Sequence, residues 1–69
     1  MSETIEVQIN QNGYQLPQGA RLSDAIAAAQ IEPPFAAAVN LQFVPKSQHA
    51  LHVLQHGDQI ELIAPITGG

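Results

Sequence analysis

The sequence predicts an α+β domain in which one main helix packs on one face of a mixed sheet of four to five strands. The chain has 69 residues, the size of one small domain. Apolar and polar residues alternate near both ends of the chain, as in strands with one buried face, whereas an alanine-rich stretch at residues 22–29 has helical spacing. A single helix among several strands packs across one face of their sheet.

Residues 4–17 are predicted to form a β-hairpin. Apolar residues alternate with polar ones over residues 5–9, which predicts a half-buried strand. Asn12-Gly13 is the strongest short signal for the hairpin turn. Pro17 is expected to close the return strand because proline cannot donate to a ladder.

A short helix is predicted whose apolar face spans residues 22–29, and its start is left open within two residues. Ser23 is the candidate N-cap, and Asp24 would lie near the positive end of the helix dipole. Pro33 and Pro34 cannot continue a helix. The apolar face, at spacings of three and four residues, consists of Leu22, Ala25, Ile26 and Ala29.

The second half of the chain is predicted to add two more strands and a final one. Residues 35–41 have the length of a buried strand, and residues 43–45 pair back onto it. Residues 46–56 are less regular, with Leu51 and Leu54 expected to point inward. The last strand follows Gly57-Asp58, a turn signal in which the aspartate is expected to brace the turn.

This order of elements predicts a β-grasp, or ubiquitin-like, topology. The first and last strands would lie side by side in parallel at the centre of the sheet, joined by right-handed crossovers. Tyr14 and Phe35 are expected to belong to the core. Residues 1–64 would form the domain, and residues 65–69 a flexible tail that ends in Gly-Gly.

The composition excludes several classes of function. Arg21 and Lys46 are the only basic residues against six acidic ones, so no nucleic-acid partner is expected. The absence of cysteine excludes disulfides, thiolate metal sites and thiol nucleophiles. Neither a signal peptide nor an apolar run of about 18 residues is visible, so we expect a cytoplasmic protein without a membrane partner.

The C-terminal Gly68-Gly69 is the candidate reactive group. A glycyl carboxylate has no side chain and can enter a narrow active site. Residues 64–69, fully extended, would reach about 20 Å at ~3.3 Å per residue, far enough to enter a partner's active site. The alternative is an incidental chain end, since small residues are tolerated there.

An ordered set of short motifs resembles the sulfur carrier proteins of thiamine biosynthesis, known as ThiS, within the ThiS/MoaD ubiquitin-like family. Two departures stand out. The family usually has Asn-Gly where this chain has Asn40-Leu41, and leucine resists positive φ, so the type of this turn is left open. The pair Pro33-Pro34 is also unusual. The residues that carry the resemblance are Val39-Asn40, Val44-Pro45, Ser47, Leu54, Gly57-Asp58, Ile60-Glu61 and Gly68-Gly69.

The resemblance implies a carrier with no catalytic residue and no cofactor or metal of its own. Gly69 would be adenylated by a ThiF-like enzyme that uses ATP and magnesium. A cysteine-desulfurase-type sulfur donor would then convert it to a thiocarboxylate, which a ThiG-like thiazole synthase consumes. The alternatives are a small subunit of molybdopterin synthase, a ubiquitin-like protein modifier, and a non-catalytic interaction domain.

Two groups of side chains outside the tail are candidate sites. If Ile60 and Leu62 point inward, Glu61 and Ile63 point outward. Together with Val44, Glu61 and Ile63 are predicted to form the patch that a partner enzyme binds, with a solvated strand position as the alternative for Glu61. The second group is His49, His52 and His56, whose spacing on a helix would suit a metal ion; surface or partly buried histidines are the alternative.

Overall fold

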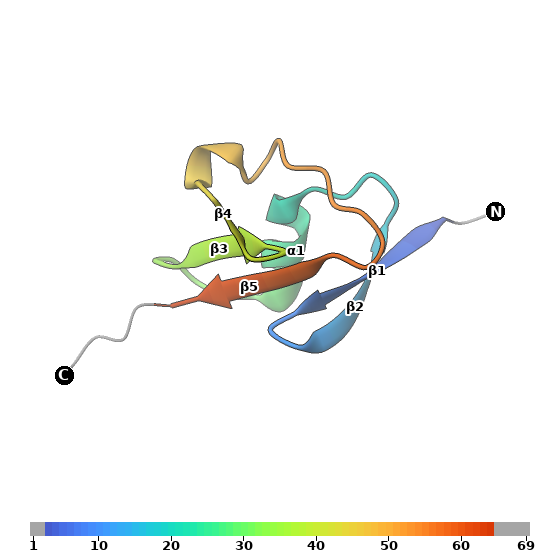
Figure 1. Ribbon diagram of the computed structural model, residues 1–69, viewed down its shortest axis with the longest axis horizontal. Helices are drawn as coiled ribbons and strands as arrows, with labels where there is room; N and C mark the ends of the chain where they lie inside the picture. Colours follow the sequence, from blue (N-terminus) through green and yellow to red (C-terminus); the bar gives the residue numbers. More distant parts are fainter. Residues whose placement is uncertain (1–2, 65–69) are drawn as a thin grey trace.

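The computed structural model describes residues 3–64, which form a five-stranded mixed sheet with one α-helix on one face (Figure 1). The sheet order is β2-β1-β5-β3-β4. β5 lies parallel to β1 and antiparallel to β3, so the predicted β-grasp topology is confirmed. The elements are β1 (Thr4–Ile9), β2 (Asn12–Pro17), α1 (Leu22–Ala29), β3 (Ala36–Val39), β4 (Gln42–Val44), the 3₁₀ turn η1 (Lys46–Gln48) and β5 (Gln59–Ile63).

The β1–β2 hairpin is confirmed, but its turn lies at Asn10-Gln11 and not at Asn12-Gly13. Both turn residues have positive φ, 50° and 72°, as in a two-residue type I′ loop. The observed register places Val7 opposite Tyr14. A turn two residues later would have placed Val7 opposite a polar glutamine, so burial of the apolar face favours the observed turn.

The β3–β4 turn also has two residues of positive φ, Asn40 at 51° and Leu41 at 70°. The Asn40-Leu41 turn, whose type the sequence analysis left open, is therefore a two-residue turn like the one at Asn10-Gln11. Leu41 adopts a backbone conformation that a side chain with a Cβ disfavours. Its side chain is 86% exposed, so no burial of its own offsets that strain.

Helix α1 begins after Arg21, and Ser23 is not its N-cap. The Asp24 carboxylate accepts the backbone N–H of Arg21 at 2.8 Å, which supports its predicted place at the start of the helix. The backbone N–H groups of Leu22 and Ser23 donate to the carbonyls of His52 and His49. The segment that contains His49 and His52 thus supplies the hydrogen-bond acceptors that a capping side chain would otherwise provide.

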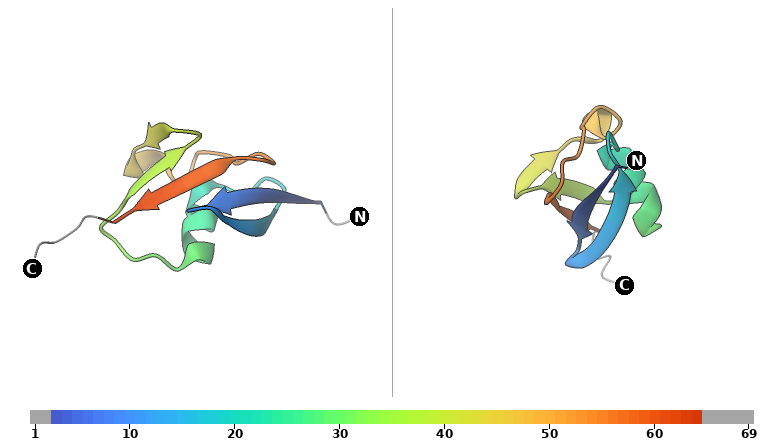
Figure 2. Two further views of the ribbon diagram at one scale, coloured as in Figure 1. Left: turned by 60° about the horizontal axis from the view of Figure 1, so that its bottom comes forward. Right: turned by 90° about the vertical axis from the view of Figure 1, so that its right-hand side faces the viewer.

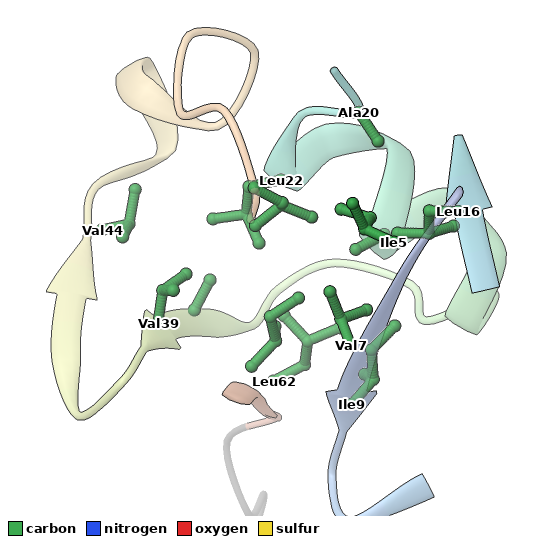
Figure 3. Close-up of a cluster of buried hydrophobic side chains, with 13 residues drawn as sticks. Ile5, Val7, Ile9, Leu16, Ala20, Leu22, Val39, Val44 and Leu62 are labelled. Atoms are coloured by element: carbon green, nitrogen blue, oxygen red, sulfur yellow. The ribbon is translucent and has the colours of Figure 1, made fainter. Parts of the chain in front are cut away.

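The core lies between the sheet and α1, with the segment after η1 closing one side (Figure 3). Leu54 is buried as predicted, but Leu51 is exposed, so its expected inward position is wrong. Tyr14 and Phe35 are partly buried and pack against the core. The buried apolar residues are Ile5, Val7, Ile9, Leu16, Ala20, Leu22, Ala25, Ala37, Val39, Val44, Leu54, Ile60 and Leu62.

Strand β5 extends beyond the end of β1 (Figure 2). The parallel register pairs Gln8 with Gln59 and Ile9 with Ile60, and β1 then turns away into the hairpin. The last two residues of β5 consequently lack a main-chain neighbour from β1. Within residues 3–64, no helix is both long and apolar enough to cross a bilayer.

Candidate functional site

The start of β5 is held by the turn between β3 and β4. The Asn40 side-chain oxygen accepts the backbone N–H of Gln59 at 3.0 Å, and its amide donates to the Asp58 carboxylate at 3.0 Å. The other Asp58 oxygen accepts the backbone N–H of Gln55 at 2.8 Å, which confirms the predicted turn-bracing role of Asp58. The short side chains of Asn40 and Asp58 therefore fix the position of the backbone where β5 begins.

The end of β5 is held by the other hairpin turn. The Asn10 amide donates to the Leu62 carbonyl at 3.1 Å, and the Leu62 N–H donates to the Asn10 side-chain oxygen at 2.9 Å. Asn10 thus supplies to β5 the pair of bonds that β1 no longer provides. These bonds fix the strand one residue before its end at Ile63.

The face of the sheet opposite α1 is open, and Ile63 lies on it. Ile60 and Leu62 are buried, whereas Glu61 is exposed and Ile63 is 59% exposed, so the predicted outward alternation is confirmed. Val44 is only 6% exposed, and its prediction as a patch residue is wrong. The register pairs Val44 with Ala37, a core residue, so Val44 points inward.

Phe43 takes the outward position that the sequence interpretation gave to Val44. It is 68% exposed and lies opposite Ala38, which in turn lies opposite Glu61. The sequence contained a signal for this. Once Asn40-Leu41 forms a two-residue turn, the pairing forces Phe43 onto the same face as Glu61.

Phe43 and Ile63 flank two alanines on this open face. Ala38 pairs with Phe43, and Ala36 pairs with Ile63. Directly opposed side chains lie about 4.5–5.5 Å apart at Cβ, so these four residues form one continuous apolar surface, which we call the sheet patch. Beside Ile63 the surface continues into a shallow apolar hollow lined by Pro34, Phe35, Ala36 and Ile63.

Glu61 borders the sheet patch, and Lys46 lines a second hollow that shares Pro34 and Phe35 with the hollow beside Ile63. The five strands contain Glu6 and Glu61, while the basic residues Arg21 and Lys46 lie before α1 and in η1. The Arg21 guanidinium donates to the carbonyl of Ala50 at 2.9 Å and so holds the crossover segment. An apolar surface bordered by a carboxylate suits a partner with apolar and basic residues.

Two of the three histidines, His49 and His56, have separate hydrogen-bond partners. The His49 Nε2–H donates to the Val44 carbonyl at 3.1 Å, and its ring stacks on Phe35 at a centroid distance of 5.9 Å. The His56 Nδ1 accepts the backbone N–H of Glu6 at 3.1 Å. Their segment is not an α-helix, and residues 3–64 contain no cluster of three ligating side chains. The buried His49 supports the structural alternative.

Gly68 and Gly69, the predicted reactive end, lie outside the described residues. The structure describes the chain up to Ala64, one residue beyond β5. The sheet patch and the hollow beside Ile63 therefore border the point where the chain leaves the sheet. A partner bound to this face would lie beside Ala64, the last residue that the structure describes.

Comparison with known proteins identifies a matching family and similar proteins. The chain matches the model of the ThiS family over residues 3–69. It is 33% identical over 66 residues to the sulfur carrier protein ThiS of Escherichia coli (strain K12), covering 94% of this chain and all of the relative. The crystal structure of the thiamine biosynthesis protein ThiS from Geobacter metallireducens superposes with a TM-score of 0.78 at 12% identity. That superposition covers 94% of this chain and all of the other, and it supports the β-grasp fold.

Proposed function

The chain belongs to the ThiS family, and from this premise we propose that it carries sulfur on Gly69 for thiazole formation in thiamine biosynthesis. The observation that supports the proposal most is the family match, which continues through residue 69. The braced strand β5 and the open face beside its end suit a domain that presents its terminus to other proteins.

The proposed chemistry begins at the Gly69 carboxylate. A carboxylate is a poor electrophile, because its oxygen is a poor leaving group. An activating enzyme would form the acyl-adenylate from ATP and release pyrophosphate. The terminal sulfur of a protein persulfide would then attack the carbonyl carbon and displace AMP, which gives an acyl disulfide. A cysteine thiolate of the partner proteins would attack the outer sulfur of this bond, form a disulfide with it and release the thiocarboxylate. Its sulfur is a soft nucleophile suited to transfer.

The carrier itself contributes position and recognition to these steps. The proposed partners are a ThiF-like adenylating enzyme, a cysteine-desulfurase-type donor and a ThiG-like thiazole synthase. ATP and magnesium would be bound by the adenylating enzyme, and this chain would act without a cofactor or a catalytic side chain. Holding a reacting group in the correct geometry removes a large part of a reaction barrier.

The sheet patch is the proposed docking surface for these enzymes. Ile63 and Phe43 project from neighbouring regions of one face, and the alanines between them leave room for partner side chains. Aromatic and aliphatic anchors of this kind dominate binding energies. Glu61, which lies opposite Ala38, is placed to meet a basic residue of the partner.

The test uses the full-length chain with a ThiF-like enzyme, ATP and magnesium. Intact-mass analysis should detect a terminal adenylate, and addition of the sulfur donor should replace one oxygen with sulfur. A chain lacking Gly69 is the control and should show neither product. Absence of both products from the natural chain would contradict the proposal. Consumption of the thiocarboxylate by thiazole synthase, and not by molybdopterin synthase, would identify the pathway.

A further inference from the structure

The β1–β2 and β3–β4 hairpins close with turns of the same backbone geometry. In the first turn, Asn10 and Gln11 have φ values of 50° and 72°. In the second turn, Asn40 and Leu41 have φ values of 51° and 70°. The first turn therefore has a polar residue where the second has a leucine. Since the two turns adopt one conformation, that conformation does not itself require a leucine.

Leucine is an unfavourable residue at this position of the turn. Its Cβ crowds the backbone at positive φ, which glycine and, less often, asparagine and aspartate tolerate. Burial does not offset this cost, because the Leu41 side chain is 86% exposed, more than Phe43 at 68% or Ile63 at 59%. A strained residue that gains so little from its own domain points to a function in binding.

Hydrogen bonds of Asn40 hold the hairpin tip in this conformation. The Asn40 N–H donates to the Gln59 carbonyl at 2.7 Å, and the Asn40 side-chain oxygen accepts the Gln59 N–H at 3.0 Å. The Asn40 amide also donates to the Asp58 carboxylate at 3.0 Å. The residue before Leu41 is thus fixed against the start of β5. A backbone that is already held in place loses less conformational freedom when a partner binds than a flexible loop does.

Leu41 extends the sheet patch to the tip of the β3–β4 hairpin. Phe43 follows two residues later, so the Cα atoms of the two residues lie within about 7 Å of each other. At the other end of the patch, Ile63 pairs with Ala36. Ala36 precedes Leu41 by five residues, and their Cα atoms are at most about 18 Å apart. Such a span fits one interface of standard size, about 800 Å² on each partner.

We propose that Leu41 is a binding anchor that inserts into an apolar pocket of the adenylating enzyme. This inference rests on the proposed function and adds the hairpin tip to the proposed docking surface. The pocket would accept a side chain of the size of leucine, which gains binding energy when it leaves water. Basic residues would border the pocket, because the Asp58 carboxylate lies beside the turn and the chain has a net charge of −4.

The test compares Leu41→Asn with Gln11→Asn in the full-length chain. Both variants place asparagine, which tolerates positive φ, at the same position of equivalent turns, so neither should lower the melting temperature. Leu41→Asn should weaken binding to the ThiF-like enzyme by about 10-fold or more, the effect of losing one buried leucine side chain. Gln11→Asn should bind within about 2-fold of the natural chain.

A third variant, Leu41→Met, separates contact from strain. It keeps an apolar side chain of similar volume at the same strained position, so it should bind more tightly than Leu41→Asn. Calorimetric titration in the absence of ATP measures docking before any chemistry, and thermal unfolding follows on the same samples. Weaker binding together with equal or higher stability is a result that a purely structural role of Leu41 would not produce.

The outcomes separate failure of this inference from failure of the proposed function. Binding of Leu41→Asn as tight as that of the natural chain would overturn the inference, and equal weakening in Gln11→Asn would do the same by tracing the effect to turn geometry. A dimer of the natural chain that Leu41→Asn dissociates would make a second copy the occupant, against the proposal. If the natural chain binds the enzyme but is never adenylated, the proposed function fails, and the titrations still decide the role of Leu41. If the natural chain does not bind, both fail.

Discussion

Asn10 and Leu62 are joined by two hydrogen bonds, one in each direction, across 52 positions of the sequence. The side-chain amide of Asn10 copies the main-chain pattern of a neighbouring strand at the point where β1 has turned away. The positive φ of Asn10 permits this geometry. One turn residue therefore closes the first hairpin and fixes the strand from which the tail departs.

Replacing Asn10 should test this brace. Asn10→Gly preserves the backbone conformation but removes both bonds, so the free energy of unfolding should fall by about 1–3 kcal/mol. Gln11→Gly is the matched control, because Gln11 has positive φ at the same turn and is exposed. It should leave stability unchanged or raise it slightly. Urea unfolding of both variants measures the difference, and equal stability of Asn10→Gly and the natural chain would show that the bonds contribute nothing.

Leu41 should be a site where substitution stabilises the protein. Its φ of 70° disfavours a leucine, and the side chain is exposed. Leu41→Gly or Leu41→Asn should raise the free energy of unfolding by up to about 1 kcal/mol. Leu41→Val should lower it, because β-branched residues resist this conformation most. Thermal unfolding checks the order of the three variants, and a marked loss of stability in Leu41→Gly would reveal a packing role for the leucine.

The alternation of residues in the sequence predicted β1, β5 and the outward Ile63, and the order of the elements predicted the parallel β1–β5 pair. The position of the first turn was not predictable locally, since it depends on burial opposite Val7 and on the contact of Asn10 with Leu62. The N-cap of α1 was assigned wrongly to Ser23 for a similar reason: backbone carbonyls of the distant segment that contains His49 replace a capping side chain.

The choice between Val44 and Phe43 shows a different limit. Both are apolar neighbours in one short strand, so composition cannot tell which is buried. Only the register with β3 decides it, because one residue of slippage exchanges the two faces. Ile63 was therefore sufficient to locate the docking surface approximately from the sequence. Its aromatic residue, Phe43, could be identified only from the β3–β4 register.

The sheet patch predicts separate effects on docking and on folding. Ile63→Asp and Phe43→Asp should each weaken binding to the adenylating enzyme by about 10-fold or more, since central apolar anchors carry most of the binding energy. Both side chains are largely exposed, so thermal stability should change little. Calorimetric titration together with thermal unfolding measures both quantities.

Thr4→Asp is the control for the sheet patch. Thr4 is exposed and lies on β1, which β5 separates from β3. It adds the same negative charge, and binding should remain within about 2-fold of the natural chain, as for most residues outside the centre of an interface. Unaltered binding by Ile63→Asp would exclude this face as the docking surface, and an unfolded Ile63→Asp variant would place Ile63 in the core.

His49 should contribute to stability in a way that the exposed His56 does not. His49→Ala removes a buried hydrogen bond to the Val44 carbonyl and the stacking on Phe35, so we expect a loss of about 1–3 kcal/mol. In His56→Ala the freed N–H of Glu6 can bond to water, and the loss should be below about 1 kcal/mol. Denaturant unfolding measures the free energy of unfolding of both variants. An equal decrease in the two would contradict the structural role assigned to His49.

Changing the terminus should separate reactivity from stability completely. Deleting Gly69, or adding one residue after it, moves or removes the carboxylate that the proposed chemistry requires, so adenylation should be lost. The melting temperature should shift by less than about 2 °C, well under 1 kcal/mol for a domain of this size, because the core residues all precede residue 63. Mass spectrometry measures adenylation, and calorimetry on the same samples measures the melting temperature. A large drop in melting temperature would mean that the terminus packs on the domain. Continued adenylation of the lengthened chain would mean that the Gly69 carboxylate is not the group that reacts.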